Sequence, residues 1–273
     1  FMSNGLVNTR DQQFVLFEML GVQDLFATEK YREFSRETFD MLLEMAQKIS
    51  EEEVLPRYME GDREGARLVN GEAKAPRCYH DLQKVMVEGG WFTMSAPTDA
   101  GGQGLPYIIE KAVQEHFIFN MAYYMYSGAG IGAAQLIEKY GTEEQKRKYM
   151  FKMFSCEWGG TMVLTEPEAG SDVGALKTKA VRQPDGSFRI FGSKIFISGG
   201  DHDLVTNIVH PVLARIEGDP AGTAGISIFL VPKYLVNADG TLGRRNDYSI
   251  TGIEHKMGLK GNEIGRASCR ERV

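Results

Sequence analysis

Two segments of the sequence combine residue types that could hold a flat cofactor. In the first, residues 162–172 (MVLTEPEAGSD), an apolar run ends in Thr-Glu-Pro and then turns through Gly-Ser-Asp. In the second, residues 194–200 (KIFISGG), a strand-like run ends in an aromatic residue, a hydroxyl and two glycines. Such turns expose backbone N–H groups and hydroxyls that can bind an anion or the carbonyl edge of a ring. The pair could clamp a heteroaromatic cofactor, and two ordinary hairpin ends are the alternative.

A third segment, residues 128–133 (GAGIGA), matches the loosened dinucleotide-binding pattern G-x-G-x-x-A. In that pattern the glycines let a pyrophosphate approach the backbone where a helix starts after a strand. Here the preceding residues 117–127 have the composition of a helix, and residues 141–154 predict another helix instead of a βαβ unit. We therefore expect these small residues to permit close helix–helix packing.

The histidines and cysteines predict neither a metal site nor a disulfide framework. No histidine lies four residues from another, and none stands at ligand spacing from a cysteine. Cys78 and Cys156 are expected to be small buried residues, and the tyrosines within residues 123–126 are expected to pack in the core. Asp201-His202-Asp203 follows two glycines, so we expect a solvated turn there.

The elements that must position these segments divide the chain into two halves. The first half, residues 1–155, carries helical patterns, and Thr142 with Gln145 predicts a capping box. Pro56 is expected to end its longest early helix. Helices are expected over residues 11–20, 35–55 and 79–88, and from Pro106 onward through residue 127.

The second half, residues 156–263, carries short β-branched and aromatic runs separated by turn residues. Pro184-Asp185-Gly186 between two such runs is a hairpin signal. Several strands without helices between them predict an antiparallel barrel or sandwich. Strands are expected over residues 160–164, 179–182, 188–191, 194–198, 204–206, 212–216 and 226–231. The predicted fold class is α+β, an all-α domain followed by an antiparallel β domain.

Composition excludes several classes of protein. The 273 residues are 42% hydrophobic and 25% charged, values that are typical of globular chains and exclude disorder or collagen. The net charge of −6 and the absence of a basic stripe argue against a nucleic-acid partner. No apolar run is long enough to span a membrane, and the start shows no secretory signal pattern. Together with three cysteines, these features favour a cytoplasmic location.

The two ends of the sequence are unusual. The chain begins with Phe1 instead of Met, as a clipped or frame-extended chain would. Residues 264–273 (IGRASCRERV) show no strand or helix periodicity and read like the translation of a common sequencing adapter. A native basic tail is the alternative. We expect this segment to be non-native, so we leave it out of the fold prediction, and we expect the native protein to continue beyond residue 262.

The motifs together resemble the acyl-CoA dehydrogenase family. The resemblance rests on residues 162–172 and 194–200, and it extends through three further segments to cover about residues 10–262. Residues 10–18 look like the extension of a longer bacterial branch, which includes 3-methylmercaptopropionyl-CoA dehydrogenase. The further segments are GGQGLP (101–106), QKRKY (145–149) and HKMGLKG (255–261).

The resemblance implies FAD as the cofactor and assigns residues to it. Thr165 would bind the pyrimidine edge of the flavin, and Leu164 and Gly170 would offer backbone contacts. Ser171 would contact both the cofactor and the acyl-CoA substrate. The remaining implied cofactor residues are Met162, Phe196, Ile197 and Ser198, with Phe196 against the ring and the Ser198 hydroxyl toward flavin N5.

The sequence departs from the family pattern at three of these positions. Met162 replaces a common aromatic residue, Phe196 a common tryptophan, and Ser198 a common threonine. Each replacement keeps a similar shape or donor, so we expect flavin binding to persist.

The implied reaction is α,β-dehydrogenation of an acyl-CoA to a trans-2-enoyl-CoA. Glu166 could be taken for the base, but the family places this glutamate in the cofactor loop and takes its base from a later helical domain. The chain is therefore expected to be an inactive fragment that lacks the C-terminal helical domain. Implied partners are an electron-transfer flavoprotein and further subunits of a homodimer or homotetramer. An acyl-CoA oxidase and a non-catalytic flavin- or acyl-CoA-binding fragment are the alternatives.

Overall fold

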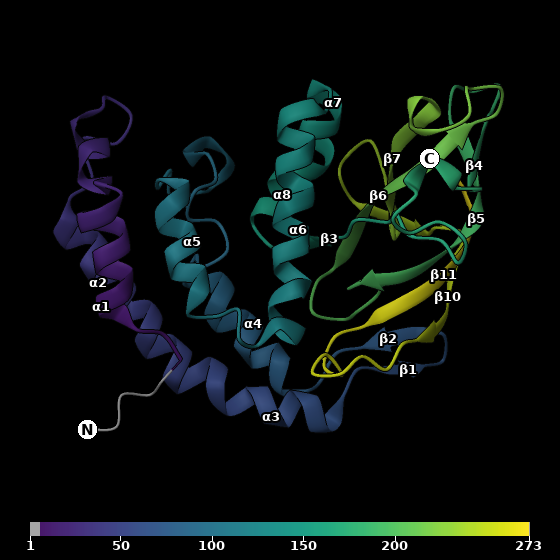
Figure 1. The fold of residues 1–273 in the computed structure, drawn as a ribbon. Helices are drawn as coiled ribbons and strands as arrows, with labels where there is room; N and C mark the ends of the chain where they lie inside the picture. Colours follow the sequence, from purple (N-terminus) through teal and green to yellow (C-terminus); the bar gives the residue numbers. More distant parts are fainter. Residues whose placement is uncertain (1–5, 273) are drawn as a thin grey trace.

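The computed structural model describes residues 6–272, and it places a row of helices beside a curled β half (Figure 1). The helical half comes first along the chain, which confirms the α+β order. No helix within this range is long and apolar enough to cross a membrane. The helices are α1 (Thr9–Gln13), α2 (Arg36–Ile49), α3 (Leu55–Glu64), α4 (Cys78–Glu88), α5 (Tyr107–Glu115), α6 (Met121–Tyr140), α7 (Glu143–Gln145) and α8 (Phe151–Phe154).

Helix α2 begins where the sequence predicts, but the helical path continues beyond Pro56. The Ser35 side chain accepts a hydrogen bond from the Thr38 N–H at 3.3 Å and caps the helix. A π-helical turn, Ser50–Val54, then joins α2 to α3, and Pro56 lies in the first turn of α3. The prediction that Pro56 ends the helix is therefore wrong. Proline lacks an N–H group, but in the first turn of a helix no N–H has a partner within the helix, so proline is tolerated there.

The glycine-rich residues 128–133 lie inside α6, so they do not open a dinucleotide-binding helix. Gly130 instead faces strand β3 (Trp158–Gly160), where an added Cβ would lie 3.1 Å from the Gly160 nitrogen. A Cβ on Gly160 would in turn lie 2.9 Å from that of Ala133. The small residues do permit close packing, as predicted. They bring helix α6 against strand β3, however, and not against a second helix. The tyrosines within residues 123–126 are buried on the same helix, as expected.

The β half is a seven-stranded sheet in the order β10-β11-β5-β4-β6-β3, with β7 beside β6. Strand β6 pairs in parallel with both β3 and β4, and the other pairings are antiparallel. The prediction of an antiparallel sheet therefore holds for the other pairings but not for these two. Strand β5 runs antiparallel to β4 and brings the chain back, so that β6 can then run parallel to β4. Besides β3, the strands are β4 (Lys179–Arg182), β5 (Phe188–Ser198), β6 (Asn207–Ile216), β7 (Ile226–Pro232), β10 (Tyr248–Ile253) and β11 (Ile264–Arg272).

Most of the expected strands are present with shifted ends. The hairpin signal is confirmed, since Gly186 (φ 84°) lies in the turn between β4 and β5. The two runs expected at 188–191 and 194–198 form one strand, β5. Two small hairpins add β1 (Arg67–Val69) with β2 (Glu72–Lys74), and β8 (Tyr234–Val236) with β9 (Leu242–Arg245).

Residues 264–272 form strand β11, which runs between β5 and β10. We leave this segment out of the fold prediction because it shows no strand periodicity, yet it forms a strand of the sheet. Backbone pairing with two flanking strands does not require an alternating side-chain pattern, because each residue offers one donor and one acceptor. Ile264 is also buried. Its adapter origin stays a prediction.

The turn at residues 201–203 is also different from the expectation. Asp201 and His202 are buried instead of solvated. The Asp201 carboxylate lies 2.5 Å from the Lys233 ammonium and accepts a hydrogen bond from the Ala73 N–H at 3.2 Å. Ala73 belongs to the β1–β2 hairpin, which covers this turn and which the sequence patterns do not predict.

Candidate functional site

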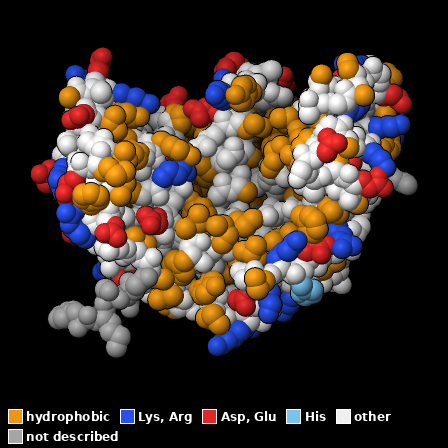
Figure 2. All heavy atoms as spheres, in the orientation of Figure 1, with side chains coloured by type: hydrophobic (Ala, Val, Ile, Leu, Met, Phe, Trp, Pro, Cys, Tyr) orange, Lys and Arg blue, Asp and Glu red, His pale blue; other side chains and the backbone are white. Residues whose placement is uncertain are grey.

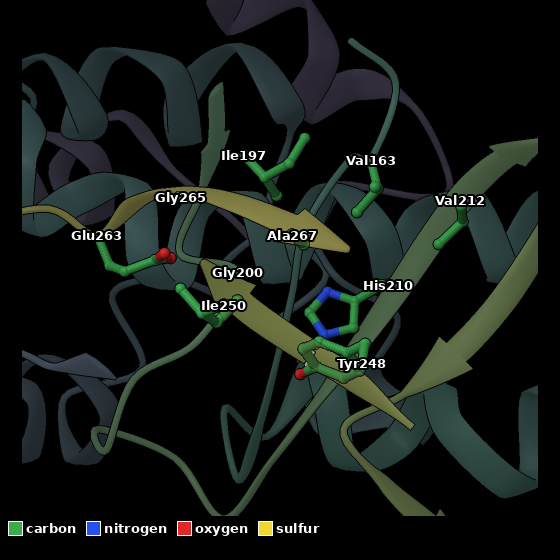
Figure 3. Close-up of a pocket in the computed structure, with 10 residues that line it drawn as sticks. All are labelled: Val163, Ile197, Gly200, His210, Val212, Tyr248, Ile250, Glu263, Gly265 and Ala267. Atoms are coloured by element: carbon green, nitrogen blue, oxygen red, sulfur yellow. Dashed lines mark hydrogen bonds between the residues drawn. The ribbon is translucent and has the colours of Figure 1, made fainter. Parts of the chain in front are cut away.

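The two segments singled out in the sequence lie side by side in the β half. The Ile195 N–H donates to the Thr165 carbonyl at 2.9 Å. Val163 and Ile197 both point into the interior of the curled sheet (Figure 3). The residues next to these two are exposed or partly exposed, so they lie on the opposite, outer side of the sheet. Those neighbours are Met162, Leu164, Phe196 and Ser198, and we call this surface the outer face.

Phe196 points outward because of a break in strand β5. The strand buries Ile190 and Lys194, so strict alternation would bury residue 196 as well. Phe196 instead has a φ of 60°, and the register with β11 shifts beside it. This bulge turns the ring outward, where it is 44% exposed, and turns Ile197 inward. The Lys256 ammonium lies 3.8 Å from the centre of the ring.

The outer face carries polar groups that are available to a ligand. Among the described residues, the hydroxyls of Thr165, Ser171 and Ser198 have no hydrogen-bond partner, and neither do the N–H groups of Leu164 and Gly170. A Cβ added to Gly170 would lie 4.0 Å from the Thr165 methyl group, so the turn at 170–171 adjoins Thr165. Open donors beside an exposed aromatic ring and the exposed Met162 fit a flat heteroaromatic ring with a carbonyl edge.

Glu166 is buried and serves the structure instead of projecting to the outer face. Its carboxylate accepts hydrogen bonds from Lys194 Nζ at 2.8 Å, from the Lys177 N–H at 2.7 Å and from the Thr178 hydroxyl at 2.5 Å. Burial favours its neutral form, but the bonds from Lys194 and Thr178 outweigh burial and lower its pKa. A carboxylate with a lowered pKa and occupied oxygens is a poor proton acceptor, which argues against Glu166 as the catalytic base.

The interior of the curled sheet is too small for a cofactor ring. Its cavity measures about 20 Å³, which is room for about one water molecule (Figure 3). The ring nitrogens of His210 lie 2.9 Å from the Thr161 hydroxyl and 3.0 Å from the Tyr248 hydroxyl. Burial, aided by the charge of Lys233, lowers the pKa of His210 to about 3, so this residue is neutral at pH 7. Its role is to link β6 and β10 to the segment before Thr165.

A separate groove runs between α5 and α6, and its lining combines apolar side chains with the charged Glu110 and Lys111 and the amides of Gln114 and Gln135. Its volume is about 330 Å³, and Gly132 lies in its wall, with no atom within 4 Å of an added Cβ. The other lining residues include Phe92, Tyr107, Ile118, Met121 and Tyr124. Over the described residues, no group of three His, Cys, Asp or Glu side chains gathers as metal ligands.

Sequence reasoning missed the residues behind the outer face. Thr178 was not singled out, and Lys194 and Lys256 were quoted within motifs without a role, although each contacts a residue of the two segments. One signal was present for Lys194, which is the only charged residue in the otherwise apolar run 194–197. A charge at a strand position that must be buried implies a buried partner.

Comparison of the chain with known proteins identifies the family to which it belongs. Residues 36–157 match the family described as "Acyl-CoA dehydrogenase, N-terminal domain", and residues 161–271 match "Acyl-CoA dehydrogenase, middle domain". The chain is 43% identical over 265 residues to a broad-specificity linear acyl-CoA dehydrogenase of Mycobacterium tuberculosis, covering 95% of this chain and 43% of that protein. It is 37% identical over 256 residues to 3-methylmercaptopropionyl-CoA dehydrogenase of Ruegeria pomeroyi, covering 93% of this chain and 43% of that protein. The chain thus spans less than half the length of these relatives.

Solved structures agree in fold. An acyl-CoA dehydrogenase of Bacillus anthracis complexed with FAD aligns with a TM-score of 0.68 at 26% identity, over 89% of this chain and 37% of that chain. A glutaryl-coenzyme A dehydrogenase in complex with glutaryl-CoA aligns with a TM-score of 0.69 at 25% identity, over 88% of this chain and 55% of that chain. By both family matches and both relatives, the chain belongs to the acyl-CoA dehydrogenase family.

Proposed function

We propose that this chain forms the flavin-binding part of an enzyme that oxidises an acyl-CoA thioester to the trans-2-enoyl-CoA with FAD. The observation that carries the proposal is the outer face, where two neighbouring segments carry open hydroxyls and N–H groups together with the exposed ring of Phe196. Support comes from the related Bacillus anthracis enzyme, whose structure contains FAD.

The residues of the outer face would have distinct tasks. The Thr165 hydroxyl and the N–H groups of Leu164 and Gly170 would bind the polar edge of the flavin. Phe196 would pack against its ring, and the Ser198 hydroxyl would donate toward N5. Bound FAD supplies the hydride acceptor for the Cβ–H bond. Ser171, exposed beside Thr165, would touch the thioester as well.

The apolar side chains of the groove between α5 and α6, among them Phe92, Ile118 and Met121, offer a surface for an acyl chain. An apolar wall excludes water and orients a hydrocarbon chain without polar contacts. We propose that the acyl part of the substrate uses this groove.

We propose that the catalytic base lies outside this chain, a proposal supported by the hydrogen bonds that Glu166 already makes with Lys194, Lys177 and Thr178. We therefore propose that the 273-residue chain binds flavin but forms no enoyl-CoA by itself.

In the whole enzyme, an electron-transfer flavoprotein would accept the electrons from the reduced flavin. Rapid reaction of the reduced flavin with oxygen would instead identify an acyl-CoA oxidase. A homodimer or homotetramer and a cytoplasmic location stay predictions.

A titration of the chain with FAD tests flavin binding. We expect Ser198→Ala to raise the Kd for FAD about 3–10-fold, the equivalent of one lost hydrogen bond of about 0.5–1.5 kcal/mol. Ser193→Ala is the matched control, because Ser193 is an exposed serine of the same strand. Failure of the wild-type chain to bind FAD, or equal weakening by both variants, contradicts the proposal.

A further inference from the structure

A buried ion pair joins the two segments directly behind the outer face. The Lys194 side chain is fully buried, and Glu166 is 6% exposed. The Lys194 ammonium donates to Glu166 Oε1 at 2.8 Å and to the Leu164 carbonyl at 2.9 Å. A buried ammonium is costly unless hydrogen bonds and an opposite charge compensate it, so this arrangement strongly favours one geometry.

Glu166 anchors the pair to the strand that lies behind it. Besides Lys194, its carboxylate accepts hydrogen bonds from the N–H groups of Lys177 and Thr178 and from the Thr178 hydroxyl. Gly192 makes room for this contact, because an added Cβ there would lie 2.3 Å from the Thr178 hydroxyl oxygen. The carboxylate therefore holds Lys194 at a fixed position relative to the start of β4.

The pair matters for register because little else holds the first segment to β5. Among the described residues, segment 162–165 is joined to β5 by one backbone hydrogen bond, from Ile195 to Thr165, and by the Lys194 ammonium. Two residues beyond Lys194, Phe196 has left-handed backbone geometry, which a non-glycine residue rarely adopts unless its surroundings impose it. Lys194 thus holds the Leu164 carbonyl of the first segment from a position two residues before the bulge that directs Phe196.

We propose that Lys194 and Glu166 form a positioning pair for the flavin, which sets the spacing and register of the two strand ends that bind it. The inference rests on the proposed flavin-binding function and deepens it. Neither side chain touches the cofactor. An apolar pair of similar volume could fill the same space, but it would leave the Leu164 carbonyl without a donor.

The test separates positioning from stability. Lys194→Met alone leaves a buried, unpaired carboxylate and is expected to destabilise the chain strongly. The double variant Lys194→Met/Glu166→Gln removes both charges and keeps an amide oxygen for Thr178. We expect it to recover much of the thermal stability lost in the single variant, while its Kd for FAD stays at least 10-fold above that of the wild type. The visible circular dichroism of the bound flavin should also change, since it reports the orientation of the ring.

Glu166→Asp gives an independent measurement in a chain that keeps both charges. Its shorter side chain draws Lys194 back and weakens the hydrogen bonds from Lys177 and Thr178. We therefore expect altered flavin circular dichroism and a several-fold higher Kd, with a smaller loss of stability than in Lys194→Met. If the double variant or Glu166→Asp binds FAD with wild-type affinity and spectrum, the positioning pair is refuted while flavin binding stands. If the wild-type chain binds no FAD, the proposed function fails first.

Discussion

Glu263 is a buried acidic residue that has few hydrogen-bond partners for its carboxyl group. Its side chain is fully buried, and one carboxylate oxygen has no hydrogen-bond partner among the described residues. Burial raises the pKa of Glu263 to about 8, although the Asp201 N–H, which donates at 3.0 Å, opposes the rise. The folded chain therefore holds a proton on Glu263 that the unfolded chain releases above its ordinary pKa of about 4.5.

This proton makes stability depend on pH. Because the folded pKa is raised, the folded state binds more protons between pH 4.5 and 8, and the free energy of unfolding should fall across that window. The slope is at most about 1.4 kcal/mol per pH unit for one group. We expect Glu263→Gln to flatten this fall, as measured by urea unfolding at pH 5, 6, 7 and 8. Glu88→Gln, an exposed carboxylate on α4, should leave the slope unchanged. A wild-type slope unaltered by Glu263→Gln contradicts this reading.

Single residues also show what the sequence could not predict. Thr165 and Ser198 could be found because their types and spacing match a known pattern. Lys194 and Glu166 form a pair across 28 positions of sequence, and only the pairing of the two segments brings them together. Asp201 was misread as solvated for the same reason, since its burial depends on a hairpin 128 positions earlier.

At the scale of elements, local signals predicted most of the architecture. The capping box of Thr142 and Gln145 forms, and the turn at 184–186 joins two antiparallel strands. These features depend on a few neighbouring residues, so sequence suffices. Pairing partners are not local, which is why the parallel neighbours of β6 and the inclusion of β11 were missed.

The contact between α6 and β3 gives a prediction at this scale. A Cβ on Gly160 would lie 2.7 Å from the Met153 methyl group and 2.9 Å from Ala133 Cβ, so Gly160→Ala overpacks the contact. We expect it to destabilise the chain by about 1–3 kcal/mol. Gly132→Ala on the exposed side of α6 is the matched control and should stabilise the chain by about 0.5–1 kcal/mol, because alanine favours helix. Thermal unfolding measures both, and equal effects of the two substitutions contradict the packing argument.

At the scale of the whole molecule, the helical half exposes a large amount of apolar surface. Met19, Leu20, Met41 and Met45 are each more than half exposed on the first helical segments. Figure 2 shows hydrophobic side chains across this face of the molecule. Apolar patches of this kind mark surfaces that associate with other molecules or promote aggregation.

We therefore expect the isolated chain to self-associate in a concentration-dependent manner. Replacing Met19, Met41 and Met45 by lysine should shift the population toward monomer in sedimentation velocity, because charge opposes burial of the patch. The control introduces the same three charges at Gln23, Thr206 and Ser249, which are exposed polar positions. A wild-type chain that stays monomeric at high concentration, or a control that is equally effective, would overturn this expectation.

The central claim is that the outer face of the β half binds the flavin. Hydrogen–deuterium exchange of the chain with and without FAD tests it most directly, because it maps protection by segment. We predict that FAD slows exchange in residues 162–171 and 196–198, and leaves the groove between α5 and α6 unchanged. Protection confined to the groove, or no protection in either strand end while FAD is bound, would contradict the account.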